Sequence, residues 1–286
     1  MKRLQPFRIV YEDNDIIVVD KASGIAVIAD HWDDSLERLD ELVGDLLKSR
    51  ATTSAEIPTE KASAGNKPAG NKPEKAPIVQ DKPIYVVHRV DRDTSGLVAF
   101  AKTAEMHKTL STAFEARLVK KRYIAVINGR PSWTEMSCDL PLRMDGDREH
   151  RTIVDRGHGK PALTEFKVLG ICGNLAVLEA FPHTGRTHQI RAHLSALGHS
   201  IACDPLYGDK KPLMLSSFKR SWRGDPFEER PILARLGLHA NSLCFDVPEL
   251  KQRDFFAPLA KDMAALISQM EKITNEDFGV ETLPSA

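Results

Sequence analysis

The sequence predicts an α+β protein built on a mixed, mainly antiparallel central sheet with flanking helices. Two observations carry this prediction. Short apolar runs occur in pairs joined by polar turns, and helical segments lie between the pairs without regular βαβ alternation. With 286 residues and 42% hydrophobic content, the chain can bury a substantial core, in one large domain or in two small ones.

The first predicted elements are a hairpin and an amphipathic helix. The runs Arg8–Tyr11 and Ile16–Val19 are strand-like and flank an acidic turn. Leucine and valine then recur at helical spacing from Leu36 to Leu47, which predicts a helix capped by Asp34 or Ser35.

Residues 51–82 have a different composition. Lys, Ala, Pro, Gly and Glu dominate this segment, and Ala64–Pro68 nearly recurs at Ala69–Pro73. Such a sequence lacks the apolar residues needed for a core, so we expect a mobile, low-complexity surface insertion.

A polar stretch, His88–Gly96, separates the strand-like runs Tyr85–Val87 and Leu97–Ala101. It places Asp91 between arginines on a loop that sheet structure holds at both ends, which suits a catalytic side chain. A solvated turn with local Arg–Asp pairs explains this segment about as well when it is taken alone. The nearby Asp93 is assigned to the turn, because turns commonly contain aspartate.

The later part of the chain continues the same pattern of strands and helices. The second polar stretch, Phe181–Leu194, leads into a helix, because apolar residues recur at helical spacing from Ile190 to Leu197. Further elements are a helix from 104 to about 116, strands at 123–128, 162–169, 175–180 and 243–247, and a last helix from 259 to about 270. Residues 273–286 are expected to form a disordered tail.

Arg186 and Arg191 lie five residues apart in the second polar stretch. At about 100° per residue they occupy different faces of a helix and should serve different purposes. One can meet an anion near the helix start, while the other reaches inward.

Taken together, the two polar stretches resemble one family, the RluA-type pseudouridine synthases. Its motifs read His-Arg-Leu-Asp-x-x-Thr-Ser-Gly and Gly-Arg-x-His-Gln-(Ile/Leu)-Arg-x-His, and only Val90 departs from the first motif. A third family element, Lys-x-Tyr, matches Lys121–Tyr123. Other segments match in order and spacing from Ile9 to about Pro258, namely Asp20–Gly24, Lys160–Ala162 with Thr164 and Glu165, Asp204–Gly208 and Leu238–Ala240.

The resemblance implies a single catalytic domain over residues 1–286, with an RNA-binding cleft across the sheet. It also implies an isomerase that detaches uracil from its ribose and reattaches it through carbon 5, without cofactor or metal. The matching positions make Asp91 the nucleophile, Tyr123 the side chain that lies against the base, and Arg191 the ion-pair partner of Asp91. Arg89 matches the residue that helps to displace the target nucleotide.

These residue types suit the implied chemistry. A carboxylate that attacks carbon must stay charged in a nearly dry pocket, and a fixed arginine favours its charged form. An aromatic face gives uracil a stacking platform, a contact worth about 1–3 kcal/mol. Without the resemblance, Tyr123 would be taken as a core aromatic residue. The sequence identifies neither the base that removes the carbon 5 proton nor whether Asp91 attacks the sugar or the base.

Further RNA contacts are expected from Arg92, Lys121, Arg186 and His188. Lysine and arginine balance aspartate and glutamate over the whole chain at 40 each, but residues 86–130 hold nine basic against four acidic residues. A local basic face of this kind favours selective contact with RNA, although cations at a helix end explain part of it.

A metal site is not predicted, because His183, His188 and His193 repeat every five residues, whereas a zinc pair on one helix face needs about four. The four cysteines show no CxxC pair, and no apolar run reaches membrane-spanning length. We therefore expect a cytoplasmic protein, and the absence of coiled-coil heptads favours a monomer. The resemblance implies that it acts on rRNA or tRNA, and no obligatory protein partner is expected. No N-terminal S4 RNA-binding module is expected. The alternative is a non-catalytic protein that binds or remodels RNA with the same fold.

Overall fold

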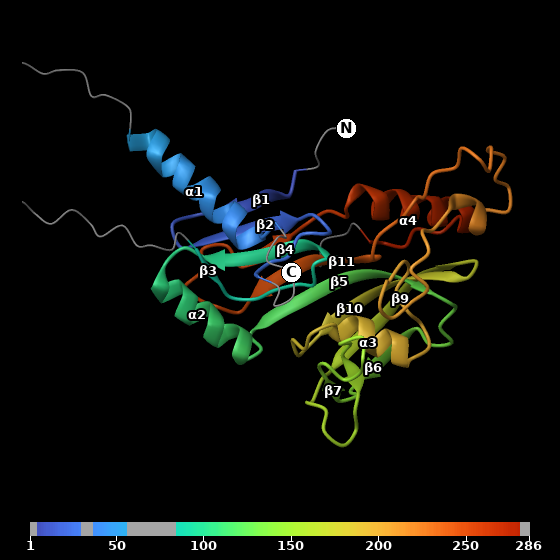
Figure 1. The fold of residues 1–286 in the computed structure, drawn as a ribbon, viewed down its shortest axis with the longest axis horizontal. Helices are drawn as coiled ribbons and strands as arrows, with labels where there is room; N and C mark the ends of the chain where they lie inside the picture. Colours follow the sequence, from blue (N-terminus) through green and yellow to red (C-terminus); the bar gives the residue numbers. More distant parts are fainter. Residues whose placement is uncertain (1–4, 30–36, 56–83, 281–286) are drawn as a thin grey trace, which may run out of the picture.

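The computed structural model describes residues 5–29, 37–55 and 84–280. Its main feature is one ten-stranded sheet that runs through the described chain (Figure 1). The strands of its first half are β1 (Phe7–Glu12), β2 (Ile16–Lys21), β3 (Tyr85–Val86), β4 (Ser95–Ala101) and β5 (Val119–Asn128). Those of its second half are β6 (Glu135–Cys138), β9 (Thr164–Cys172), β10 (Leu175–Pro182), β11 (Leu238–Phe245) and β12 (Asp254–Phe256).

The strand order is β1-β2-β4-β11-β5-β10-β9-β6, with β3 beside β4 and β12 beside β11. All pairs are antiparallel except β4 with β11, which run parallel in the middle of the sheet. The predicted α+β class with a mixed, mainly antiparallel sheet is therefore confirmed.

Four helices in the described part of the chain cover the two faces of this sheet. Helices α1 (Leu39–Ala55) and α2 (Ala104–Glu115) pack on opposite faces near β4, because alternate residues of β4 contact one helix or the other. Helices α3 (Gln189–Ala196) and α4 (Lys261–Thr274) do the same around β5 and β10. Figure 1 shows the two pairs at different ends of the sheet. A short 3-10 helix covers residues 215–217.

Most predicted elements are present, with shifted boundaries. The hairpin β1–β2, helix α2 and strand β10 lie where the patterns place them. Strand β11 begins at Leu238 rather than Leu243, because the buried polar residues His239 and Asn241 interrupt its apolar pattern.

The observed bounds of helix α1 differ from the predicted start of this helix and from the predicted start of the insertion at residue 51. The helix starts at Leu39, three residues after Leu36, and the proposed caps Asp34 and Ser35 lie outside the described residues. It continues to Ala55, so the first five residues of the expected insertion 51–82 are helical. No proline or glycine stops a helix there until residue 58. Residues 56–82 lie outside the described part of the chain.

The expected disordered tail from residue 273 also needs correction. Helix α4 ends at Thr274, and the chain then returns to the sheet, where Phe278 and Val280 are buried. A Cβ atom at Gly170 would lie 2.2 Å from the Phe278 ring, so β9 leaves space for this ring. Residues 281–286 lie outside the described residues.

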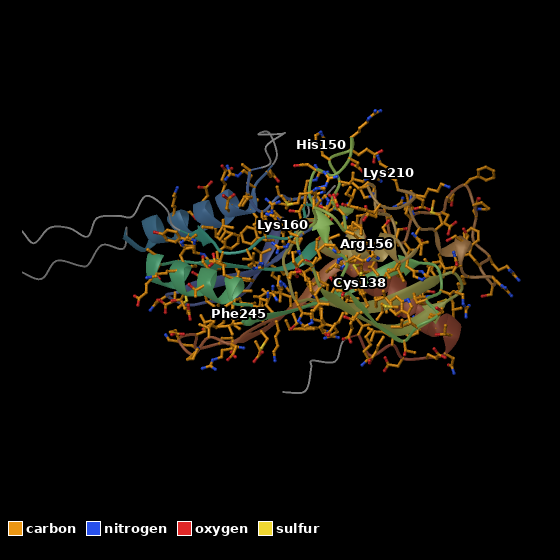
Figure 2. The ribbon with its side chains drawn as sticks, turned by 90° about the horizontal axis from the view of Figure 1, so that it is seen from below. Cys138, His150, Arg156, Lys160, Lys210 and Phe245 are labelled. Carbon is orange, nitrogen blue, oxygen red and sulfur yellow. The ribbon has the colours of Figure 1, made fainter. Side chains whose placement is uncertain are left out.

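The sequence patterns missed several short strands. A two-stranded hairpin, β7 (Leu142–Arg143) with β8 (Ile153–Val154), projects from the main body. In Figure 2, His150 lies at the outer edge of the molecule in the turn of this hairpin, whereas Cys138 lies within the body. Strands of two residues are too short to show a hydrophobic period.

Gly96 sits where β4 packs closely against β11. A Cβ atom at this position would lie 2.2 Å from the carbonyl oxygen of Ala240, and the backbone has a φ of +108°. Only glycine satisfies both conditions. The close approach joins the Asp91 loop, which ends at β4, to the centre of the sheet.

We predict that Gly96→Ala lowers the free energy of unfolding by about 3 kcal/mol, from overpacking together with backbone strain. Gly24→Ala is the matched control, since Gly24 has a φ of +91° but nothing within 4 Å of its Cβ position. It should lose about 1–2 kcal/mol from strain alone. Urea denaturation measures both values, and equal losses would contradict the close approach.

Candidate active site

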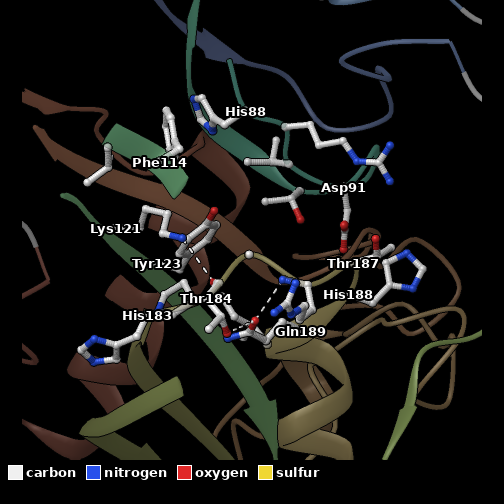
Figure 3. A pocket seen from close by; sticks show the side chains of 18 of the residues that line it. His88, Asp91, Phe114, Lys121, Tyr123, His183, Thr184, Thr187, His188 and Gln189 are labelled. Carbon is white, nitrogen blue, oxygen red and sulfur yellow. Dashed lines mark hydrogen bonds between the residues drawn. The ribbon is translucent and has the colours of Figure 1, made fainter. Parts of the chain in front are cut away.

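A cavity of about 610 Å³ opens beside the middle of the sheet (Figure 3). Three segments form most of its wall, namely residues 87–94, 114–123 and 182–191. The two polar stretches of the sequence therefore meet across one cavity, together with the start of β5.

The Asp91 loop is fixed by hydrogen bonds to its own backbone and to the segment after β2. Thr94 N donates to the Asp91 carbonyl oxygen at 3.1 Å, and Gly24 N donates to that of Arg92 at 2.9 Å. Ser23 Oγ donates to the Asp93 carbonyl oxygen at 2.7 Å. The loop is thus held rigidly at the cavity wall.

Lys21 reinforces this loop from behind. Its side chain is fully buried, and Nζ donates to the carbonyl oxygens of Ala22, Ile25 and Arg92 at 2.9, 2.9 and 2.8 Å. Burial lowers the pKa of Lys21 to about 7, and the negative charges of Asp93 and Asp91 offset part of this effect. With these three hydrogen bonds, the ammonium has a carbonyl acceptor for each of its three protons.

Arg191 connects two carboxylates. Its Nε and Nη2 atoms each donate to Asp204 at 2.8 Å, and Nη1 donates to Asp91 Oδ2 at 3.1 Å. The side chains of Arg191 and Asp204 are 3% and 0% exposed, whereas that of Asp91 is 21% exposed. The bidentate pair therefore anchors the guanidinium, and the remaining nitrogen positions Asp91 at the cavity surface.

The charges of this cluster are mutually stabilised. Burial opposes ionisation of Asp204, but the hydrogen bonds and charge of Arg191 outweigh it and hold the pKa of Asp204 below its ordinary value. Burial likewise opposes the charge of Arg191, and the two aspartates keep its pKa above the ordinary range.

Tyr207 packs beneath the cluster. Arg191 Cζ lies 5.1 Å from the Tyr207 ring centroid, in a cation–π contact. The Tyr207 hydroxyl donates to the Thr152 carbonyl oxygen at 3.0 Å and lies 3.2 Å from Nδ1 of His188. His188 has a left-handed φ of 52° at the start of α3, which turns the chain into the helix.

Gln189 shapes the loop before α3. Its Oε1 accepts from Thr184 Oγ1 at 2.6 Å and from Arg186 N at 3.0 Å, while Nε2 donates to the Leu163 carbonyl oxygen and to Thr164 Oγ1, both at 2.9 Å. This buried amide uses both of its polar atoms and fixes residues 184–186 in the wall.

Lys121 and Tyr123 enter the cavity from β5, because residues two apart on a strand share a face. Lys121 Nζ donates to the Thr184 carbonyl oxygen at 3.3 Å. Burial, together with the charge of Asp91, raises the pKa of the Tyr123 phenol, which stays neutral. The two side chains lie side by side in Figure 3.

Two histidines near the site, the half-buried His88 and the buried His193, are neutral. Burial, with a smaller contribution from Lys121, lowers the pKa of His88 to about 3. His88 Nε2 accepts from Ala99 N at 2.9 Å, and the ring stacks on Phe114. Burial also lowers the pKa of His193.

The structure places the predicted RNA-contact residues in two groups. Arg89, Lys121, Arg186 and His188 line the cavity, with Arg89 exposed at its rim. Arg92 lies outside the cavity, exposed, with Nε 3.4 Å from Asp93. His183 lines the cavity as well and pairs with Glu165 at 3.0 Å.

Metal-binding and membrane-spanning features were sought in the described ranges. No group of three or more His, Cys, Asp or Glu side chains in residues 5–29, 37–55 and 84–280 could hold a metal ion. None of the helices described is long and apolar enough to cross a membrane.

A family model described as RNA pseudouridylate synthase matches residues 15–196, which include Asp91, Tyr123 and Arg191. The chain belongs to this family. Family membership makes the protein an isomerase that acts on RNA.

Curated relatives carry the name ribosomal large subunit pseudouridine synthase D. The one from Zymomonas mobilis is 33% identical over 95% of this chain and 75% of its own length. The one from Nitrosomonas europaea is 30% identical over 94% of this chain and 66% of its own length. The solved structure of human RNA pseudouridylate synthase domain containing 4 has the same fold, with a TM-score of 0.64 and 22% identity over 92% of each chain.

Sequence reasoning on this pseudouridylate synthase missed the roles of several supporting residues. Lys21, Asp204 and Tyr207 fall within segments that resemble the family, but no spacing rule connects them to Asp91 or Arg191. Lys21 and Asp204 are buried and Tyr207 is half-buried, and only the folded chain shows which groups they contact.

We predict that Asp204→Asn lowers the free energy of unfolding by about 3 kcal/mol, because it leaves Arg191 buried with one carboxylate instead of two. The folded pKa of Asp204 is depressed, so its stabilising contribution is present above about pH 4 and is lost as pH falls through the folded value.

Denaturation curves at pH 7 and at pH 3 measure this difference, which should shrink at the lower pH. Asp145→Asn is the control, since the Asp145 side chain is 71% exposed and should change stability by less than about 0.5 kcal/mol. Equal stability of the Asp204→Asn variant and the wild type at pH 7 would contradict the anchoring role.

Proposed function

We propose that the protein converts uridine to pseudouridine in RNA within a single catalytic domain, with Asp91 as the nucleophile. The observation that carries the proposal is the Asp91–Arg191 contact at the cavity wall. Arg191 engages Oδ2 of Asp91, and within the described residues Oδ1 accepts no hydrogen bond. One carboxylate oxygen is therefore oriented while the other faces the cavity, free to attack carbon.

The cavity wall suits an extruded nucleotide. Enzymes that act on a base take it out of the stack and hold it in a pocket. Tyr123 offers an aromatic face for uracil, worth about 1–3 kcal/mol. Its neutral hydroxyl adds no charge that would repel the base.

The rim supplies cations for the RNA backbone. We assign Arg89 to displacement of the target nucleotide, since it is exposed beside Asp91. Arg186 and His188 would meet phosphates near the start of α3, and Arg92 would contact RNA outside the cavity. Phosphate contacts position the RNA, and the target uridine is then selected by shape.

The printed names of the relatives favour large-subunit ribosomal RNA as the substrate, with transfer RNA as the alternative. We also propose that the enzyme works in the cytoplasm as a monomer. A protein that only binds or remodels RNA is the less supported function, because a carboxylate facing a polyanion weakens binding.

We predict that Asp91→Ala lowers the rate of pseudouridine formation by at least about a thousandfold, because the nucleophile is lost. RNA affinity should stay the same or improve, since a negative charge is removed. The measurement is tritium release from RNA labelled at carbon 5 of uridine, prepared from a strain that lacks the gene.

Asp93→Asn is the matched control, because Asp93 does not line the cavity, and it should keep wild-type activity. Unchanged tritium release by Asp91→Ala would show that another residue is the nucleophile. Absence of release even by the wild type would favour the non-catalytic alternative.

We predict that Arg186→Gln weakens RNA binding and lowers the slope of log affinity against log salt by about 0.7–0.9, the value for one lost phosphate contact. Filter binding at several salt concentrations measures the slope. Arg253→Gln, directly before β12 and outside the cavity wall, is the control and should leave the slope unchanged. An unaltered slope for Arg186→Gln would remove Arg186 from the RNA contacts.

A further inference from the structure

Lys121 differs from the other cations of the cavity wall. Arg89 and Arg117 are exposed, and Arg191 is held by two carboxylates. Arg186 is half-buried, but it lies in the loop before α3 rather than beside Tyr123, and its Nε donates to the Pro161 carbonyl oxygen at 3.1 Å. Lys121 is half-buried, and no ion pair joins it to a carboxylate within residues 5–29, 37–55 and 84–280. Its single hydrogen bond goes to the Thr184 carbonyl oxygen, so two of its three protons have no acceptor in the described part of the chain.

A desolvated ammonium without a counter-ion is costly, and it favours an anion that enters the cavity. Burial lowers the pKa of Lys121 to about 8, which leaves it mostly protonated at neutral pH. The site therefore holds a positive charge that the folded protein itself does not neutralise.

The position of Lys121 indicates whether its partner is a phosphate or the uracil ring. It precedes Tyr123 by two residues on β5, and both side chains face the cavity (Figure 3). A uracil stacked on Tyr123 would present its edge to a neighbour on the same strand face. The exposed arginines at the rim are better placed for the hydrated phosphates.

We infer that Lys121 is a catalytic residue whose ammonium stabilises negative charge on the uracil ring during the reaction; this inference rests on the proposed function. When the bond between C1′ and N1 breaks, its electron pair leaves with the base, and the charge spreads over N1 and the ring oxygens. Asp91 compensates the electron-deficient sugar carbon. If Asp91 adds to the ring instead, the displaced electron pair moves to a ring oxygen. The Lys121 ammonium then stabilises the negative charge on that oxygen.

The remaining steps return all atoms to balance. The ring rotates, a bond forms between C1′ and C5, and the bond that Asp91 had formed, to C1′ or to the ring, breaks and returns the free carboxylate. The proton on C5 is lost to a base, and N1 gains a proton. Lys121 donates hydrogen bonds throughout and ends with the protons with which it began. No oxidant, reductant or co-reactant is required.

The test compares Lys121→Met, Lys121→Arg and Lys120→Met with wild type, using RNA labelled with tritium at carbon 5 of uridine. Lys120 is the matched control, since it is exposed and does not line the cavity. Single-turnover rates at saturating enzyme report the chemical step, and filter binding reports affinity. Thermal melting confirms that each variant is folded.

We expect Lys121→Met to lower the saturating rate by about 100-fold, as removal of one donor to a developing anion does, with affinity changed less than about threefold. Lys120→Met should match wild type, and Lys121→Arg should recover most of the rate. A saturating rate for Lys121→Met within threefold of wild type would overturn the inference. So would a loss confined to affinity, which would indicate a phosphate contact.

The pH dependence gives a second readout that does not depend on the Met variant folding. The wild-type rate should fall as pH rises above about 8, where Lys121 loses its proton, whereas Lys121→Arg should show no fall in that range. The other titratable or charged groups in the wall are His88, Arg89, Asp91, Glu115, Arg117, Tyr123, His183, Arg186, His188 and Arg191. The arginine variant keeps all of these, so an identical fall in both proteins would overturn the inference.

The same experiment separates this inference from the proposed function. If wild type releases tritium, Asp91→Ala does not, and Lys121→Met equals wild type, only the role of Lys121 fails. If wild type releases none, the proposed function itself fails.

Discussion

The buried contact of Arg191 with two carboxylates is the interaction on which the rest of the site depends. Asp204 fixes the guanidinium through two hydrogen bonds, and only then can the third nitrogen orient Asp91 from a loop 100 residues away. A buried pair of this kind contributes little net stability, because desolvation offsets much of the attraction. What it provides is a fixed position for a carboxylate that must stay charged next to a cavity.

The sheet explains why these segments meet. The parallel pair β4–β11 places the end of the Asp91 loop beside β11, and β5 lies on the other side of β11. Gly96 allows β4 to approach the backbone of Ala240 closely, so the loop ends at a rigid point. Strand β5 then carries Lys121 and Tyr123 to the same cavity.

The polar groups around the cavity are of two kinds: those whose hydrogen bonds are made within the protein, and those that can still bind a molecule in the cavity. One group hydrogen-bonds to the backbone or to neighbouring side chains and so fixes the structure of the wall. It consists of Lys21, His88, Gln189 and Tyr207. Asp91 and Lys121 each retain hydrogen-bonding capacity toward the cavity. A site built this way is preorganised, since little reorganisation is needed when charge develops on a bound base.

The sequence by itself determined the α+β class, the β1–β2 hairpin, helix α2 and the two polar stretches, because local periodicity and turn residues encode them. Its resemblance to a family also singled out Asp91, Tyr123 and Arg191. Only the tertiary structure decided that Asp204 holds Arg191, that Lys21 supports the Asp91 loop, and that Phe278 returns to the sheet. These contacts join residues far apart in the chain, and no local pattern records which buried polar group will meet which partner.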